Sequence, residues 1–135
     1  MGWRVRGVRG ATTVEANTIE AVRVAVLELM EAIEKTNQID PSEIVSATFS
    51  VTPDIDVIFP AQVARSRANW EHVPLLDVQQ MYVKGGLSKC VRVLLHVNSD
   101  LGQSQIQHIY LNRAKDLRPD LACNHYDILA NLGNN

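Results

Sequence analysis

Apolar and polar residues alternate along this chain with two different periods, which separate the helix that we expect from the strands. Between residues 16 and 37 the apolar positions are three and four residues apart, and this spacing predicts one long helix with a buried face. Those positions are Ile19, Val22, Val26, Leu29, Met30 and Ile33. Asn17 is the expected N-cap, because Glu20 follows it three residues later as in a capping box.

Four other segments carry apolar side chains at alternate positions or in short runs, which is typical of β-strands. They are residues 3–9, 44–51, 73–83 and 90–97. In the second of these, Val45, Ala47, Phe49 and Val51 should share one face. We expect the last two strands to be joined by a turn over the sequence KGGLSK, whose glycines suit a hairpin. Pro60 opens a short helix, and the segment SQIQHIYL is either a helical turn or an irregular extended piece.

This order of elements predicts an α+β fold, in which one long helix and short helices cover the outer face of a small, mostly antiparallel sheet. The other face still carries Phe49 or its neighbours, Arg92 and Leu94. A small sheet that is apolar on both faces suggests that the second face packs against another subunit. We expect a single domain over residues 1–121 and a poorly ordered tail over residues 122–135.

The composition restricts the classes of function. The chain has 135 residues, 46% hydrophobic and 21% charged, which fits one globular domain with a single core. Its 13 basic and 15 acidic side chains argue against binding of nucleic acid through bulk charge. We find neither an apolar run that could span a membrane nor a signal-peptide segment. The two cysteines, Cys90 and Cys123, form no disulfide framework, so we expect a reducing compartment such as the cytoplasm.

Two arginines stand where a strand face should be apolar. Arg9 shares a face with Trp3, and Arg92 lies mid-strand before Leu94. A charge in such a place needs an anionic partner. One interpretation is an internal ion pair, for which Asp77 is the chief candidate. The other is a site where arginines from separate segments bind an external anion.

Other kinds of chemistry are not indicated. His72, His96, His108 and His125 lack the spacing of metal ligands, no residue stands in the setting of a nucleophile, and KGGLSK is not a phosphate-binding loop. Arg65 and Arg118 enlarge the set of arginines. The residues alone therefore predict either a binding module or an enzyme that works by positioning and fixed charge, without metal or cofactor.

Four motifs carry a family resemblance: RGVRGATTVEANT near the start, TPDIDVIFPAQVAR in the middle, GGLSKCVRVLLHV after it, and HIYL followed by LRPDL. In this order they resemble the monofunctional chorismate mutases of the AroH class, from about residue 3 to residue 121. The resemblance implies a homotrimer that packs its sheets into a central pseudo-barrel, with active sites between subunits. It also implies conversion of chorismate to prephenate, a [3,3] rearrangement in phenylalanine and tyrosine biosynthesis, without cofactor or metal.

The resemblance also implies roles for single residues. Arg92 would lie at the ether oxygen, where negative charge develops as the C–O bond breaks, and a fixed cation there stabilises the transition state more than the ground state. Arg9 would pair with a substrate carboxylate and Tyr110 would hydrogen-bond one. The other residues that the resemblance assigns to the cleft are Phe59, Ala61 and Arg65 from the adjacent subunit, and Leu117 and Arg118 from the C-terminal part.

The chain departs from the family pattern in the segment LLDVQQM. Leu76 replaces a threonine, Asp77 replaces a cysteine, and Gln80 replaces the glutamate that accepts a hydrogen bond from the substrate's ring hydroxyl. Our hypothesis is that Asp77 meets this hydroxyl with Gln80 as a neutral neighbour, although a regular strand would place the two on opposite faces. Gln62, where many relatives have lysine, should affect substrate binding more than turnover.

Two alternatives remain at this point. A non-catalytic regulatory module of the same fold would bind an anionic metabolite through Arg9 and Arg92 without turnover. A hydrolase of the reactive-imine deaminase family would share the general trimeric architecture, but its motifs are not evident in the sequence.

Overall fold

The computed structural model of the chain describes residues 2–122. Its strands are β1 (Arg4–Thr13), β2 (Ile44–Val51), β3 (Leu75–Gln79), β4 (Cys90–Ser99) and β5 (Ile109–Tyr110). Its helices are α1 (Ile19–Asn37), α2 (Pro60–Arg65) and α3 (Pro119–Ala122), with the shorter 3-10 turns η1 (Pro41–Glu43), η2 (Gln103–Gln105) and η3 (Asn112–Leu117). The segment SQIQHIYL therefore holds both a turn and a short strand. The predicted tail lies, apart from Ala122, outside the described residues.

The five strands form one sheet in the order β3-β2-β4-β1-β5. The β1–β4 and β2–β4 pairs are antiparallel, whereas the β1–β5 and β2–β3 pairs are parallel. The α+β class is confirmed, but the mostly antiparallel character that we predicted is not confirmed, because the sheet is mixed. Parallel neighbours need a crossover, and α2 lies on the crossover from β2 to β3.

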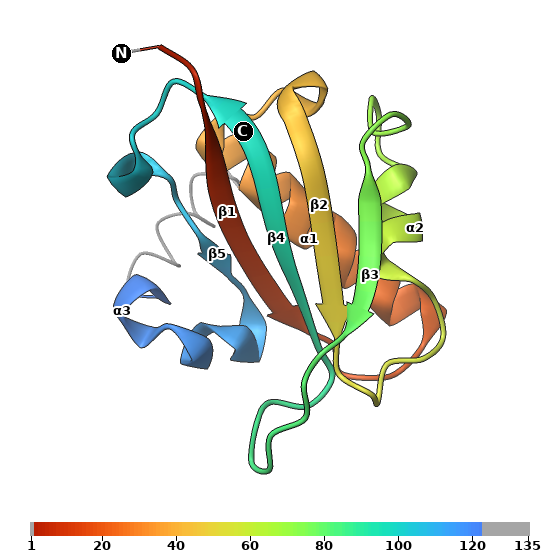
Figure 1. Cartoon of the computed structure of the whole chain (residues 1–135). Helices are drawn as coiled ribbons and strands as arrows, with labels where there is room; N and C mark the ends of the chain where they lie inside the picture. Colours follow the sequence, from red (N-terminus) through yellow and green to blue (C-terminus); the bar gives the residue numbers. More distant parts are fainter. Residues whose placement is uncertain (1, 123–135) are drawn as a thin grey trace.

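The predicted hairpin between β3 and β4 is also wrong, because β2 lies between these two strands. The chain leaves β3 at Gln79 and reaches β4 only at Cys90. The intervening segment projects below the sheet as a long loop (Figure 1). It exposes the side chains of Met81, Tyr82 and Val83.

The hydrophobic core lies between α1 and one face of the sheet, and Figure 1 shows α1 behind β2 and β4. The predicted helix face is confirmed, except that Ile19 at the first turn stays exposed. The fully buried side chains on the two sides of this layer include Val22, Val26, Leu29, Met30 and Ile33 of α1, and Val8, Phe49, Val93 and Leu95 of the sheet. Phe49 thus faces the helix and not the uncovered side.

Two local features differ from the prediction. Thr18, not Asn17, caps α1, since its side chain accepts a hydrogen bond from the Ala21 N–H. Asn17 instead exchanges hydrogen bonds with Asp56. At the start of β2 the pairing with β4 shifts, so Ile44 is buried while Val45 is exposed. An irregular start of this kind reverses the alternation by one residue.

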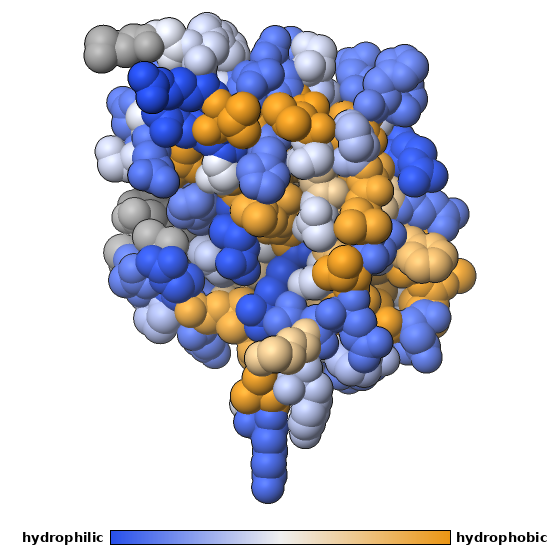
Figure 2. Space-filling view, in the orientation of Figure 1, coloured by the Kyte–Doolittle hydropathy of each residue, from blue (hydrophilic) through white to orange (hydrophobic). Residues whose placement is uncertain are grey.

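In the part of the chain that the structure describes, no helix covers the second face of the sheet. Its exposed apolar side chains come from three strands and are Val5, Leu76, Val78 and Leu94. Figure 2 shows this face, where apolar side chains lie over the sheet with polar ones among and around them. We call it the open face. None of the described helices is long and apolar enough to cross a membrane.

Candidate active site

Arg9, Arg92 and Gln80 lie together on the open face. They line a cavity of about 280 Å³ with Thr48, Ser50, Val93 and Leu94. The pairing of the strands explains the cluster. Arg9 of β1 lies opposite Leu94 of β4, and Ser50 of β2 lies opposite Arg92 of β4. The strands β1, β2 and β4 therefore direct these side chains to the same face. Residues that are more than 80 apart in the sequence thereby line one cavity.

The cavity is cationic. Among the described residues, none of the ion pairs includes Arg9 or Arg92, so the internal pair with Asp77 is not formed. Arg92 Nε is buried and has no hydrogen-bond partner within residues 2–122. Beside it, burial raises the pKa of the Cys90 thiol, although the Arg92 charge opposes this shift, so the thiol is neutral. Two uncompensated guanidinium groups in a half-buried cavity favour an anionic ligand.

Gln80, the residue directly after β3, extends its side chain into the same cavity. Its backbone N–H donates to Val51 O, and its side-chain oxygen accepts a hydrogen bond from Ser50 Oγ at 2.7 Å. Ser50 was not among the predicted site residues. The alternation of β2 could have identified it, because it places Ser50 on the face opposite to Phe49.

Asp77 lies on the other face of β3, where the structure does not bring it together with Arg92. Its Oδ1 accepts a hydrogen bond from the Ala61 N–H at 3.0 Å. Burial raises the pKa of this carboxyl, while the bond from Ala61 and the charge of Arg65 act in the opposite direction. Asp77 and the exposed Phe59 line a separate groove of about 680 Å³. The predicted residues Phe59, Ala61, Arg65 and Asp77 therefore form a second group, at the β3–α2 edge.

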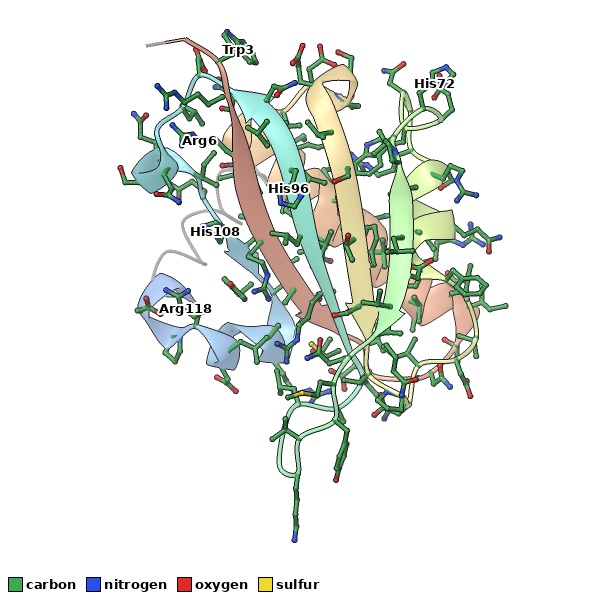
Figure 3. The ribbon with its side chains drawn as sticks, viewed as in Figure 1. Trp3, Arg6, His72, His96, His108 and Arg118 are labelled. Atoms are coloured by element: carbon green, nitrogen blue, oxygen red, sulfur yellow. The ribbon has the colours of Figure 1, made fainter. Side chains whose placement is uncertain are left out.

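The C-terminal residues of the prediction lie near β1. Tyr110 pairs with Ala11 and is buried with Ala114, and Leu117 packs against this cluster. Arg118 forms an ion pair with Asp120 at 2.8 Å, which raises the pKa of the guanidinium. Leu76 lies opposite Thr48, so it belongs to the open face. Figure 3 shows Arg118 on the β5 side of the sheet, below His108.

His108 is a further residue that the sequence did not identify. The backbone N–H of Arg9 donates to its Nδ1 at 3.0 Å. No local pattern could have indicated this contact, which joins residues that are 99 positions apart.

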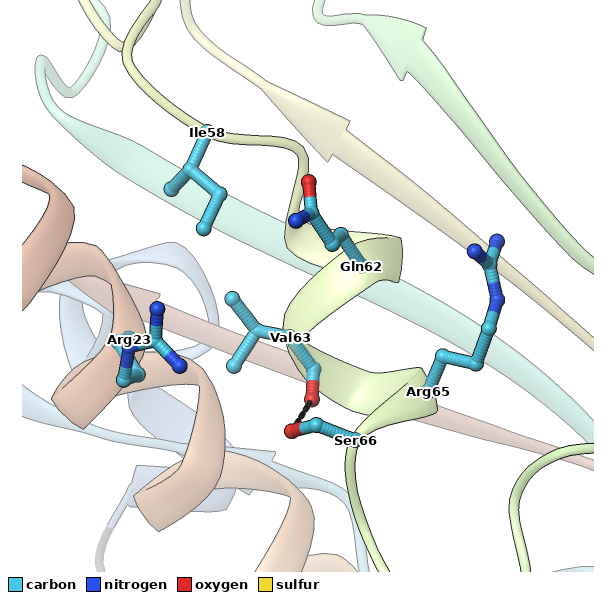
Figure 4. Close-up of a pocket in the computed structure, with 6 residues that line it drawn as sticks. All are labelled: Arg23, Ile58, Gln62, Val63, Arg65 and Ser66. Carbon is cyan, nitrogen blue, oxygen red and sulfur yellow. Dashed lines mark hydrogen bonds between the residues drawn. The ribbon is translucent and has the colours of Figure 1, made fainter.

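A different cavity, of about 300 Å³, lies between α1 and α2 (Figure 4). It is lined by Arg23, Ile58, Gln62, Val63, Arg65 and Ser66. Figure 4 shows the Arg65 side chain extending away from Arg23, so the two cations do not converge on one ligand. Within residues 2–122 no group of three or more histidine, cysteine or acidic side chains could hold a metal ion.

Comparisons with known proteins agree on one family. The family profile described as "Chorismate mutase type I" matches residues 5–121. "Chorismate mutase AroH" of Bacillus subtilis (strain 168) is 43% identical over 118 residues, which cover 87% of this chain and 93% of the relative. "Chorismate mutase AroH" of Thermus thermophilus is 42% identical over 118 residues, 87% of this chain and 96% of the relative.

A solved structure supports the same relationship. It is titled "Chorismate mutase from Clostridium thermocellum Cth-682" and superposes with a TM-score of 0.79 at 38% sequence identity. The match covers 82% of this chain and 97% of the solved one.

Proposed function

The chain belongs to the type I chorismate mutase family, and from this we propose that it converts chorismate to prephenate in the synthesis of phenylalanine and tyrosine. The reaction is an intramolecular [3,3] rearrangement that breaks a C–O bond and forms a C–C bond. It needs no nucleophile, and the enzyme has to hold the substrate folded and stabilise charge. The observation that carries the proposal is the cavity shared by Arg9 and Arg92, whose guanidinium groups have no carboxylate partner in the described chain.

In this mechanism Arg92 acts on the ether oxygen. Negative charge develops on that oxygen as the C–O bond stretches, so a fixed cation stabilises the transition state more than the bound substrate. The unpaired Nε of Arg92 is a donor already in place for this purpose. Arg9 pairs with one substrate carboxylate, and Tyr110 and Arg118 act on the carboxylates from the C-terminal side.

We assign the contact with the ring hydroxyl to Gln80, because it lies in the cavity of Arg92. Its amide can both donate to and accept from a hydroxyl. Asp77 then holds Ala61 at the start of α2 through their hydrogen bond. This assignment reverses the order of importance that the sequence alone suggested for the two residues.

The site is completed by a second subunit of a homotrimer. Phe59, Ala61 and Arg65 line no part of the Arg9–Arg92 cavity of their own chain. The open face carries exposed apolar side chains that burial against other copies would remove from water. A trimer in which each open face packs in the centre brings the β3–α2 edge of one subunit to the cavity of the next.

The proposal places the protein in the cytoplasm. It is supported by Cys90, which is a buried free thiol as expected of a protein from a reducing compartment.

The decisive test of the function is the loss of chorismate absorbance with purified protein. We expect turnover by the natural sequence, and a kcat lower by about 100-fold or more in Arg92→Ala, since one donor to a developing oxyanion contributes about that factor. Arg4→Ala is the matched control, because Arg4 is an exposed residue at the start of β1 and does not line the cavity. Thermal stabilisation by chorismate without turnover would instead show a non-catalytic binding module.

A further inference from the structure

His108 makes a bond for which the mechanism above has no use. It stands directly before β5, half-buried, and its Nδ1 accepts the hydrogen bond from the Arg9 backbone. Arg9 is the residue whose guanidinium lines the cationic cavity. The ring therefore touches the backbone of a substrate-binding residue without touching the cavity itself.

The pairing of β5 explains why an imidazole takes this place. Ala11 O accepts from the Leu111 N–H, so the backbone of β1 presents its polar groups to β5 at alternate residues, Arg9 among them. The next acceptor along β5 is the Gln107 carbonyl, which already accepts a hydrogen bond from Asn37 Nδ2. The His108 ring continues the ladder where the β5 backbone turns away to α1.

The hydrogen bond from Arg9 requires His108 to be neutral and unprotonated at Nδ1. Because Nδ1 accepts the Arg9 N–H, the ring proton of the neutral form lies on Nε2. Protonation at Nδ1 would set two N–H groups against each other and break the bond. The Arg9 N–H then loses the acceptor that it has in the structure.

The charges near the His108 ring also favour its neutral form. Among the described residues, those that act on it are Arg9 of β1 and Arg118, which follows η3. Both are cations, and Asp120 of α3, which pairs with Arg118, offsets part of the Arg118 charge. Burial first, and then these two charges, lower the pKa of His108 below 6.5. The ring is thus neutral at neutral pH and becomes charged only in more acidic solution.

We propose that His108 is a positioning residue: its neutral ring holds the β1 backbone at Arg9, and protonation of the ring releases Arg9 and weakens substrate binding. The inference rests on the proposed function. Because Arg9 binds a carboxylate and does not act on the breaking bond, its release raises KM more than it lowers kcat.

Two variants distinguish the role of His108 as a hydrogen-bond acceptor from the effect of its protonation. Asn Oδ1 in His108→Asn can accept the Arg9 N–H but does not titrate, whereas His108→Leu removes the acceptor at every pH. His72→Asn is the matched control, since it removes an exposed imidazole at the other side of the sheet (Figure 3). KM and kcat for chorismate are measured from about pH 5 to pH 8, a range in which the substrate carboxylates stay ionised.

We expect the KM of the natural sequence and of His72→Asn to rise as the pH falls through the pKa of His108, by about 3- to 10-fold, the effect of one hydrogen bond. His108→Asn should keep the low KM throughout, and His108→Leu should have the high KM throughout. Parallel pH profiles of KM for the natural sequence and His108→Asn would overturn the inference. So would a KM of His108→Leu equal to that of the natural sequence at pH 8.

An NMR measurement tests the geometry without turnover. The ring nitrogens of His108 in the free protein should show the Nε2–H form at neutral pH, with titration below pH 6.5. A proton on Nδ1 at neutral pH would overturn the inference even in an active enzyme. An inactive protein that shows the expected ring form would contradict the proposed function and leave the bond to Arg9 standing.

Discussion

Gly10 lies where β1 packs tightly against α1, and we expect Gly10→Ala to destabilise the protein. A Cβ atom there would lie 2.6 Å from Ile33 Cδ1, 3.0 Å from Val93 Cγ1 and 3.2 Å from Leu29 Cδ1. These side chains are at most 1% exposed, so they have little space to move into. Overpacking of this kind costs about 1–3 kcal/mol. The free energy of unfolding should fall by that amount.

The assay is urea unfolding at a fixed protein concentration, because assembly of subunits adds to the apparent stability. Gly7→Ala on the same strand is the matched control: its Cβ would meet only Leu94 Cδ1, at 3.8 Å, which is ordinary contact. We expect the control to change stability by no more than about 0.5 kcal/mol. Equal stability of Gly10→Ala and Gly7→Ala would refute the claim that α1 is packed against β1 this tightly. Displacement of β1 should also lower kcat/KM, since Arg9 is the adjacent residue.

Three further predictions concern other residues. Gln80→Ala should reduce kcat more than Asp77→Asn does in the chorismate assay, because Asn can still accept the Ala61 N–H; the reverse order would support a catalytic Asp77. Burial raises the pKa of Asp77 above 3.8, so the folded state holds this proton more tightly and stability falls as the pH rises through 3.8 and the folded pKa. At pH 7 the melting temperature of Asp77→Asn should therefore be at least as high as that of the natural sequence, and at about pH 3 the two melting temperatures should be equal. A lower melting temperature of Asp77→Asn at pH 7 would contradict this prediction. Glu34 forms an ion pair with Arg67 and accepts a hydrogen bond from Trp70 Nε1; the Glu34 side chain is 12% exposed and that of Arg67 is 20% exposed. Glu34→Gln should therefore lower the free energy of unfolding in urea by about 2 kcal/mol, less than the loss of a fully buried pair. A change below about 0.5 kcal/mol would show that the pair contributes little to stability.

The long helix and the strand faces could be predicted because they depend on local periodicity. The spacing of Val22, Val26 and Leu29 follows from helix geometry alone, and the alternation around Arg92 follows from strand geometry. The order of the strands in the sheet could not be predicted, because it depends on which segments meet in space. The glycines of the β3–β4 loop suit a hairpin equally well, although β2 lies between the two strands.

The same limit applies to the site. Arg9 and Arg92 were recognisable because a cation on a partly apolar strand face needs an explanation. The separation of Asp77 from Gln80 follows from the regular pleat of β3, which carries Asp77 towards α2 and Gln80 towards Ser50. The role of His108 depends on a contact between its side chain and a distant backbone N–H. A sequence pattern does not record such a contact.

A crystal structure with a bicyclic mimic of the rearrangement transition state would test the central claim most directly. The account predicts a guanidinium nitrogen of Arg92 about 3 Å from the ether oxygen of the mimic, with Arg9 of the same subunit on a carboxylate. Phe59 and Ala61 should reach the mimic from the neighbouring subunit. A mimic bound elsewhere, or an Arg92 directed away from its ether oxygen, would contradict the account.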